Sequence, residues 1–222
     1  MEVLKELRSS EFNQATEEAL KSHRYFQDAE AGTLSKPQLA ALVQEQYSIQ
    51  KADLKSLTHL SERCKAEGRE AGAKLFSMLA QGEELASGLL MDMAAWLGLS
   101  QEDLDCYLCS MEAQAYPSYL ARCAHYGTPA MVAAACAVNF PCWGAQCGRI
   151  KDALISGKGF DPCTEKDVAF LTFFATPIDG FDQLAAKCIE EEGSNFSAVK
   201  EAVRLLQACE LMFWDSIYKT GL

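Results

Sequence analysis

Apolar side chains recur along this chain at spacings of three and four residues, which is the period of an amphipathic α-helix. Alternation with a period of two, which would predict strands, is absent over any useful length. The pattern therefore predicts an all-α protein. The expected helical segments are 4–29, 36–67, 70–97, 101–123, 129–156, 165–175, 179–192 and 197–219.

Capping residues separate these segments. Gly32 and Gly98 are expected to end helices, because glycine readily adopts the left-handed conformation that closes a helix. Side chains that accept a hydrogen bond from the first helical turn are expected at Ser35, Ser100, Thr128 and Thr164. No repeat, linker or low-complexity stretch interrupts the series. We therefore expect residues 1–222 to form a single domain, a helical bundle.

Charge and hydropathy narrow the range of partners. The net charge is −11 at pH 7, and the lysines and arginines are scattered among acidic residues. Nucleic acid and anionic membranes are therefore poor partners on electrostatic grounds. No apolar run reaches the roughly 18 residues that a membrane span requires, and the N-terminus does not resemble a signal peptide. A cytoplasmic protein is the expectation.

The chain has ten cysteines, but nothing indicates a disulfide framework. Most of them fall within helical patterns, which favours free thiols in a reducing compartment. Cys106 and Cys109 have CxxC spacing without a second pair, so we interpret them as one helical turn with two buried small residues. Three isolated histidines are too few for a di-metal carboxylate centre. No metal and no cofactor are expected.

Polar residues on otherwise apolar helix faces are the candidates for a site, and Glu210 is the clearest of them. It interrupts the apolar stripe formed by Val199, Val203, Leu206, Phe213 and Ile217. Burying a carboxylate is costly unless the group is paired or protonated. Glu210 therefore either has a functional role or pairs with a buried arginine or tyrosine.

Three further polar side chains are weaker candidates. Glu45 shares a face with Leu42, although the neighbouring stripe through Tyr47 is equally able to be the buried one. Tyr47 would then be a core residue with one hydroxyl hydrogen bond. Tyr116 precedes Pro117 within a helical pattern, and a proline bend beside aromatic residues can shape a pocket. A simple packed kink is the alternative.

Residues 139–150, NFPCWGAQCGRI, place a proline, two cysteines and a tryptophan in an alanine-rich stretch. Cys142 directly follows Pro141 and is the obvious candidate nucleophile. Its thiol would be reactive only if a neighbouring group lowered its pKa, so an inert buried thiol is the alternative.

Four segments resemble, in order and spacing, the TenA family (thiaminase II, aminopyrimidine aminohydrolase), whose members have an all-helical heme-oxygenase-like fold. The segments are SHRYFQDAEAGTLSKPQL at 22–39, VQEQY at 43–47, EAQAYPSYL at 112–120 and ELMFWDSIY at 210–218. The likeness extends over nearly the full chain. It implies the same fold here, with a pocket between the helices that carry these segments.

The resemblance also implies roles for particular residues. A glutamate of the family moves protons, an aspartate holds the amidine edge of the substrate ring, and tyrosines line the pocket. Glu210 matches the glutamate and Tyr116 one tyrosine, whereas Glu45 stands where the aspartate is usual. We take Glu45, Tyr47 and Tyr116 as candidate substrate-binding residues. Two expected tyrosines are replaced, by Ser48 and Pro177.

The family cysteine has two possible matches in this chain. The local Pro-Cys motif selects Cys142, whereas counting back eight residues from Gly148, as the family pattern requires, selects Phe140. In the second register Phe140 is a stacking surface and either Asn139 or Cys136 lies at the edge of the pocket. Two positions on a helix are about 200° apart, so only one of the two side chains is expected to line the pocket.

The resemblance implies a metal-independent hydrolase for an amino-pyrimidine or thiamin-related compound in thiamin salvage, with Glu210 and Cys142 as its candidate catalytic residues. The alternative is a non-catalytic protein that binds a small heterocycle in the same pocket. Heme oxygenase itself is disfavoured, because His23 matches the opening TenA motif better than a proximal haem ligand. The resemblance further implies a homo-oligomer, a tetramer.

Overall fold

The computed structural model describes residues 1–193 and 196–220, and within these ranges every regular element is helical. The all-α prediction is confirmed. The helices are α1 (Glu2–Arg8), α2 (Glu11–Lys21), α3 (Arg24–Ala31), α4 (Lys36–Ala66), α5 (Glu70–Leu97), α6 (Gln101–Asp105), α7 (Met111–Tyr126), α8 (Pro129–Ile155), α9 (Ala169–Ala175), α10 (Phe181–Glu192) and α11 (Phe196–Lys219).

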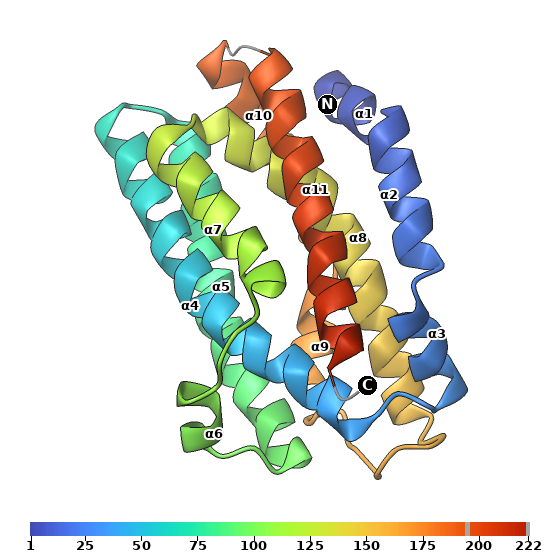
Figure 1. Ribbon diagram of the computed structural model, residues 1–222. Helices are drawn as coiled ribbons and strands as arrows, with labels where there is room; N and C mark the ends of the chain where they lie inside the picture. The colour runs from blue at the N-terminus through green and yellow to red at the C-terminus, as the bar shows by residue number, and fades with distance from the viewer. Residues whose placement is uncertain (194–195, 221–222) are drawn as a thin grey trace.

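The long helices α4, α5, α8 and α11 form the body of a bundle (Figure 1). Helix α11 packs against both α7 and α8, while α4 packs against α5 and α7. The short helices α9 and α10 cover α8, and the N-terminal helices run down the side of the bundle next to α8 and α11 (Figure 1). Among the described residues, no helix combines the length and the apolar character needed to span a bilayer.

The predicted caps are present where the long helices begin and end. Ser35 Oγ accepts a hydrogen bond from the backbone N–H of Gln38, and the backbone N–H of Ser35 donates one to Oε1 of Gln38 (2.9 Å), which completes a capping box. Thr128 caps α8 in front of Pro129. Gly32 and Gly98 both adopt positive φ, 71° and 77°, and end α3 and α5 as expected.

The expected single helix over 4–29 is wrong, because the structure divides it into α1, α2 and α3. Ser10 accepts a hydrogen bond from the backbone N–H of Asn13, and Nδ1 of His23 accepts one from that of Tyr25. Each side chain satisfies a backbone donor at the start of a new helix. These side-chain hydrogen bonds compete with the backbone i→i−4 hydrogen bonds of a continuous helix, and the helix is therefore interrupted at both places.

The expected helix over 101–123 is also divided, into α6 and α7. The segment 106–110 between them is not helical; Cys106 is exposed and Cys109 is half-buried. The interpretation of these two cysteines as a buried helical turn is therefore wrong. Ser110 starts α7 by accepting a hydrogen bond from the backbone N–H of Ala113, which leaves the five residues before the helix as a loop.

The interior consists of two apolar clusters, one at each end of the bundle. The first includes Leu60, Phe76 and Val203, and the second includes Leu42 and Trp214. Tyr116 of α7 packs against both clusters. The cavities of the molecule lie at this boundary, where apolar packing gives way to polar side chains.

Candidate functional site

Two cavities meet between α5, α8 and α9. The inner one has a volume of about 40 Å³ and lies among α4, α5, α7, α8, α9 and α11. The outer one has about 1080 Å³, the size of a small-molecule site. Both are lined by Glu83, Phe140, Trp143 and Phe174, which therefore mark the junction between them.

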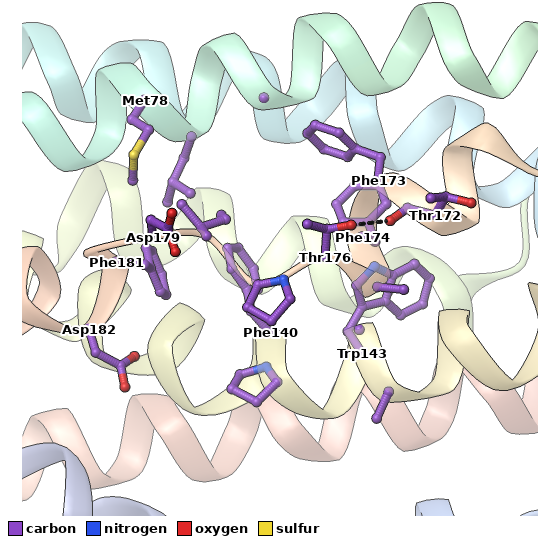
Figure 2. Close-up of a pocket in the computed structure, with 18 of the residues that line it drawn as sticks. Met78, Phe140, Trp143, Thr172, Phe173, Phe174, Thr176, Asp179, Phe181 and Asp182 are labelled. Carbon is purple, nitrogen blue, oxygen red and sulfur yellow. Dashed lines mark hydrogen bonds between the residues drawn. The ribbon is translucent and has the colours of Figure 1, made fainter.

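The outer cavity has mainly apolar walls. Figure 2 shows Phe140 and Trp143 on α8, Phe173 and Phe174 on α9, and Met78 on α5 around it. Its charged lining residues other than Glu83 are Arg8, Glu165, Asp179 and Asp182. Arg8 forms an ion pair with Asp182 (2.7 Å), so the cavity has a net acidic character.

Glu210 of α11 is buried and faces the inner cavity. Nδ2 of Asn139 donates a hydrogen bond to its Oε2 (2.5 Å), and Nε1 of Trp214 donates one to its Oε1 (3.3 Å). Burial raises the pKa of Glu210 from its ordinary 4.5 to about 8, and the two hydrogen bonds oppose the rise only in part. A carboxyl group with a pKa near neutrality can both donate and accept a proton at physiological pH.

Three more titratable groups surround the same cavity. Asp53 of α4 and Glu83 of α5 are lining residues, and Tyr116 of α7 lies with them. Burial raises the pKa of Asp53 well above its usual range, and the negative charge of Glu83 raises it further. Burial raises the pKa of Glu83 to about 8. The pKa of the Tyr116 phenol is raised by burial and then by Asp53, so it stays protonated.

Four of the residues proposed from the sequence line the inner cavity: Tyr116, Asn139, Phe140 and Glu210. Asn139 links Glu210 to a second polar residue, because its Nδ2 also donates to Oε1 of Gln207 (2.8 Å). The ring of Phe140 stacks on that of Phe181, with centroids 5.5 Å apart. Of the two possible matches to the family cysteine, Phe140, selected by counting back from Gly148, is therefore the one whose side chain lines the cavity.

Cys142 lines neither cavity. It lies on the side of α8 that faces α2, near the charges of Glu17 and Lys21, because two residues separate it from Phe140 on the helix. Burial, followed by the charge of Glu210, raises the pKa of its thiol well above the usual range. The geometry thus places Cys142 outside the walls of both cavities, with a raised pKa that disfavours the thiolate, and its role as a nucleophile stays a prediction.

Glu45 also lies outside both cavities. Its buried carboxylate accepts hydrogen bonds from the backbone N–H of Ser110 (2.8 Å), from Nε2 of Gln114 (2.8 Å) and from Oη of Tyr107 (3.3 Å). These contacts attach the start of α7 to α4. Both carboxylate oxygens of Glu45 are thus occupied by contacts with α7 and the loop before it, and its binding of substrate stays a prediction that this geometry does not favour.

Tyr47 is half-buried on the opposite side of α4 from the cavities. Its Oη donates to Asp105 (2.7 Å) at the end of α6, and Nζ of Lys51 lies 3.6 Å from its ring centroid. One residue on a helix is a rotation of about 100°, so Tyr47 is turned away from the lining residue Gln46. Tyr47 is therefore not among the lining residues of either cavity, and its substrate contact stays a prediction.

Sequence reasoning missed Asp53 and Glu83. The signal that identified Glu210 was available for both, because each interrupts a stripe with helical spacing. Asp53 lies between Ile49 and Leu57, and Glu83 lies between Leu79 and Ala86, and all four of these neighbours are buried. Helices α4 and α5 are long and their apolar faces are broad, so a single acidic residue within such a face does not stand out in the sequence.

The described residues contain no group of three or more His, Cys, Asp or Glu side chains that could hold a metal ion. Asp53, Glu83 and Glu210 converge on one cavity, but they do not form such a group. The groups that the inner cavity offers are its carboxyls, the hydrogen-bond donors beside them and its aromatic walls.

Several solved structures share the fold. A TenA homologue from P. horikoshii OT3 is 16% identical, with a TM-score of 0.73 over 99% of each chain. A TenA homologue from Pseudomonas syringae pv. tomato DC3000 is 13% identical, with a TM-score of 0.79 over 96% of this chain and 91% of that one. A heme oxygenase-like domain of unknown function from Shewanella denitrificans OS217 is 14% identical, with a TM-score of 0.71 over 94% and 89%.

At these identities the structural likeness establishes the fold, which is heme-oxygenase-like. No curated protein sequence gives a significant match. A family model does match, and it covers residues 10–220, nearly the whole length. The chain belongs to the TENA/THI-4/PQQC family.

Proposed function

We propose that this protein binds an amino-pyrimidine or a thiamin-related compound at the junction of the two cavities and hydrolyses it, with Glu210 as the group that transfers the proton. The observation that carries the proposal is the buried Glu210 carboxyl at the inner cavity, with two hydrogen-bond donors and a pKa of about 8. Membership of the TenA family supports the same substrate class.

The aromatic residues at the junction suit a flat heterocycle. Phe140, Trp143 and Phe174 line both cavities and can sandwich a ring, while the inner cavity is only large enough for its polar edge. That edge would meet Asp53, whose Oδ1 has no hydrogen-bond partner among the described residues. Asp53 thus takes the ring-holding role that the family resemblance had suggested for Glu45.

Water is the nucleophile in this proposal, since the Cys142 thiol lies outside the cavities. The water oxygen bonds to the carbon that carries the leaving amine, and the C–N bond breaks. Glu210, which is largely protonated at pH 7, gives its proton to the departing amine. The carboxylate that remains takes up the proton released by the water, which restores the starting state.

A non-catalytic heterocycle-binding protein is the second candidate. It is favoured by Phe140, which occupies the cavity wall where the family nucleophile would be in the register counted from Gly148, and by Pro177 in place of a tyrosine. Incubating the purified protein with thiamin and amino-pyrimidines separates the two, when products and retained ligand are analysed by mass spectrometry. Hydrolysed products support the enzyme, whereas an unchanged, retained ligand supports the binder.

The same assay tests the role of Cys142. We expect Cys142→Ser to leave turnover within about twofold of the parent protein, because the thiol touches neither cavity and a residue that makes no contact with the substrate contributes little to transition-state binding. Phe140→Ala, on the cavity wall, is the matched variant and should weaken substrate binding. A loss of turnover by orders of magnitude in Cys142→Ser, with the fold unchanged, would contradict this assignment.

A homo-oligomer, a tetramer as in the family, is a further proposal. Leu108, Met111 and Tyr126 are large apolar side chains that are 91%, 82% and 89% exposed, as interface residues are in an isolated subunit. Light scattering at micromolar concentration should report about four times the mass of one chain. A particle of 24.4 kDa, the mass of a single chain, would overturn the proposal.

A further inference from the structure

Asp53 and Glu83 both line the inner cavity, and Glu83 also lines the outer one. Within the part of the chain that the structure describes, neither carboxyl forms an ion pair or accepts a hydrogen bond. The family resemblance assigned neither residue a role. Two acidic groups brought together in the interior repel each other, so the arrangement is costly for the protein alone.

Asp53 shows the lack of a hydrogen-bond partner most clearly. Its side chain is only 5% exposed, its Oδ1 is buried without a hydrogen-bond donor, and the residue lines the inner cavity. Buried polar atoms in native proteins almost always have a partner. An acceptor that is left unpaired at the wall of a cavity is positioned for a donor that a ligand brings.

The groups around the pair supply no positive charge. Tyr116 comes from α7, Cys136 from α8 and Glu210 from α11, and all three are acids or weak acids. The guanidinium of Arg8, which lines the outer cavity, is already paired with Asp182. When the pair ionises, the groups named here provide no positive charge to balance it, so a cationic ligand would do so.

The outer cavity indicates what the rest of the ligand is like. Its volume of about 1080 Å³ is far larger than a single amino-pyrimidine ring needs, and its walls are mainly apolar. Phe173 and Phe181 line the outer cavity but not the inner one, and their rings extend the apolar wall from the junction residues Phe174 and Phe140 (Figure 2). Such a surface favours an extended apolar substituent.

We propose that the Asp53–Glu83 pair binds the cationic end of an amphiphilic ligand, an amidinium or ammonium group whose aromatic or other apolar body fills the outer cavity. This inference rests on the proposed function in one respect, that the ligand site is this cavity. It goes further in naming the charge and the shape of the ligand. An amino-pyrimidine meets the requirement when it is protonated at its amidine edge and carries an apolar substituent.

Binding of a cation changes the protonation of the pair. Burial raises the pKa of both carboxyls, and the charge of Glu83 raises that of Asp53 further, so the protonated forms are favoured in the empty site. A bound cation stabilises both ionised forms, so binding releases protons. The affinity for a permanent cation should therefore rise between pH 6 and about 8, where Glu83 ionises on its own.

Isothermal titration calorimetry on the full chain tests the proposal with benzamidine, an aromatic amidinium, and with benzamide, its neutral analogue. We expect benzamidine to bind with the release of protons, seen as a heat that depends on the ionisation enthalpy of the buffer. Benzamide should bind roughly tenfold more weakly or worse, because it lacks the charged donors. Equal binding of the two probes, or no binding of benzamidine, would overturn the proposal.

Two variants locate the site. Asp53→Asn and Glu83→Gln should each weaken benzamidine binding roughly 30-fold or more, because each removes one partner of a buried charge contact. Glu165→Gln removes an acidic residue of the outer cavity away from the junction and is the matched control, with little expected effect. If the control loses as much affinity as the two variants, the pair is not the site. Circular dichroism establishes that each variant is folded before titration.

One more variant separates this inference from the proposed function. Glu210→Gln removes the proposed proton-transfer group but leaves Asp53 and Glu83 intact. It should still bind benzamidine even though turnover is lost. If amino-pyrimidines are never hydrolysed while benzamidine binds through the pair, the enzyme proposal fails and the cation site stands. If hydrolysis occurs and benzamidine binding does not depend on Asp53 or Glu83, the cation site fails and the enzyme proposal stands.

Discussion

Glu210→Gln is expected to lower the turnover of an amino-pyrimidine substrate by roughly two to four orders of magnitude, with the helical fold retained. Glutamine has the same shape and can still accept a hydrogen bond from Asn139 or Trp214, but it has no proton to exchange. Steady-state kinetics on the purified variant measure the effect. The loss should appear in kcat rather than in KM, because the group acts on the departing amine.

The pH dependence of the parent enzyme follows from the same carboxyl. As a proton donor, Glu210 must be protonated, so turnover should be retained below pH 8 and fall as the pH rises through the pKa of about 8. A pH–rate profile with no alkaline limb would contradict the role. Glu45→Gln is the matched variant, because Glu45 is also a buried carboxylate but lies outside both cavities, and we expect it to lose stability and retain turnover.

Glu210→Gln should also change the pH dependence of stability. The pKa of this carboxyl is raised in the folded state, from 4.5 to about 8, so its favourable contribution is complete below pH 4.5 and is lost as the pH rises to about 8. Glutamine does not titrate. The variant should therefore gain stability relative to the parent across this window, measured as the free energy of unfolding in urea.

Trp214→Ala is expected to reduce the free energy of unfolding by roughly 3–5 kcal/mol. The side chain is fully buried, and its ring lies against those of Phe26, Trp143 and Phe213, with centroids 4.6, 5.2 and 5.0 Å apart. Truncation leaves a cavity among aromatic rings that come from α3, α8 and α11. Urea unfolding followed by circular dichroism measures the loss.

Two further variants make that result specific. Trp96→Ala removes a half-buried tryptophan whose Nε1 donates to the carbonyl of Pro162 (3.1 Å), and it should cost clearly less. Trp214→Phe keeps most of the packing but removes the Nε1 donor to Glu210, so it should raise the pKa of Glu210 further. A Trp214→Ala protein as stable as the Trp96→Ala protein would show that the aromatic cluster is not a main support of the bundle.

The helical pattern of the chain was sufficient to predict the class of fold and most helix ends. Caps at Ser35 and Thr128 and stops at Gly32 and Gly98 depend on side chains and backbone conformations within one turn, and they formed as expected. The breaks at Ser10, His23 and Ser110 depend on equally local hydrogen bonds. These breaks were not predicted, because the sequence alone does not distinguish a polar residue that caps a helix from a polar residue on the solvent-exposed face of one.

The sequence also identified one acidic group of the cavity correctly as buried. Glu210 interrupts a narrow stripe on α11, and a single polar residue stands out against it. Asn139, Phe140 and Tyr116 were named as well and line the same cavity. For residues 139–142, however, the sequence supported two registers, and only the rotation of α8 against its neighbours decided that Phe140 lies at the cavity and Cys142 faces α2.

The remaining features depend on how whole helices are placed against one another. Glu45 and Asp53 are both buried acidic residues of α4. The start of α7 lies beside Glu45 and donates hydrogen bonds to its carboxylate, whereas the inner cavity lies beside Asp53. Asp53 and Glu83 come from different helices, and the pKa of Asp53 is raised by burial and then further by the charge of Glu83. Helical periodicity determines which residues of one helix share a face. Which faces then meet is decided by packing between residues far apart in the sequence, and only the tertiary structure contains that information.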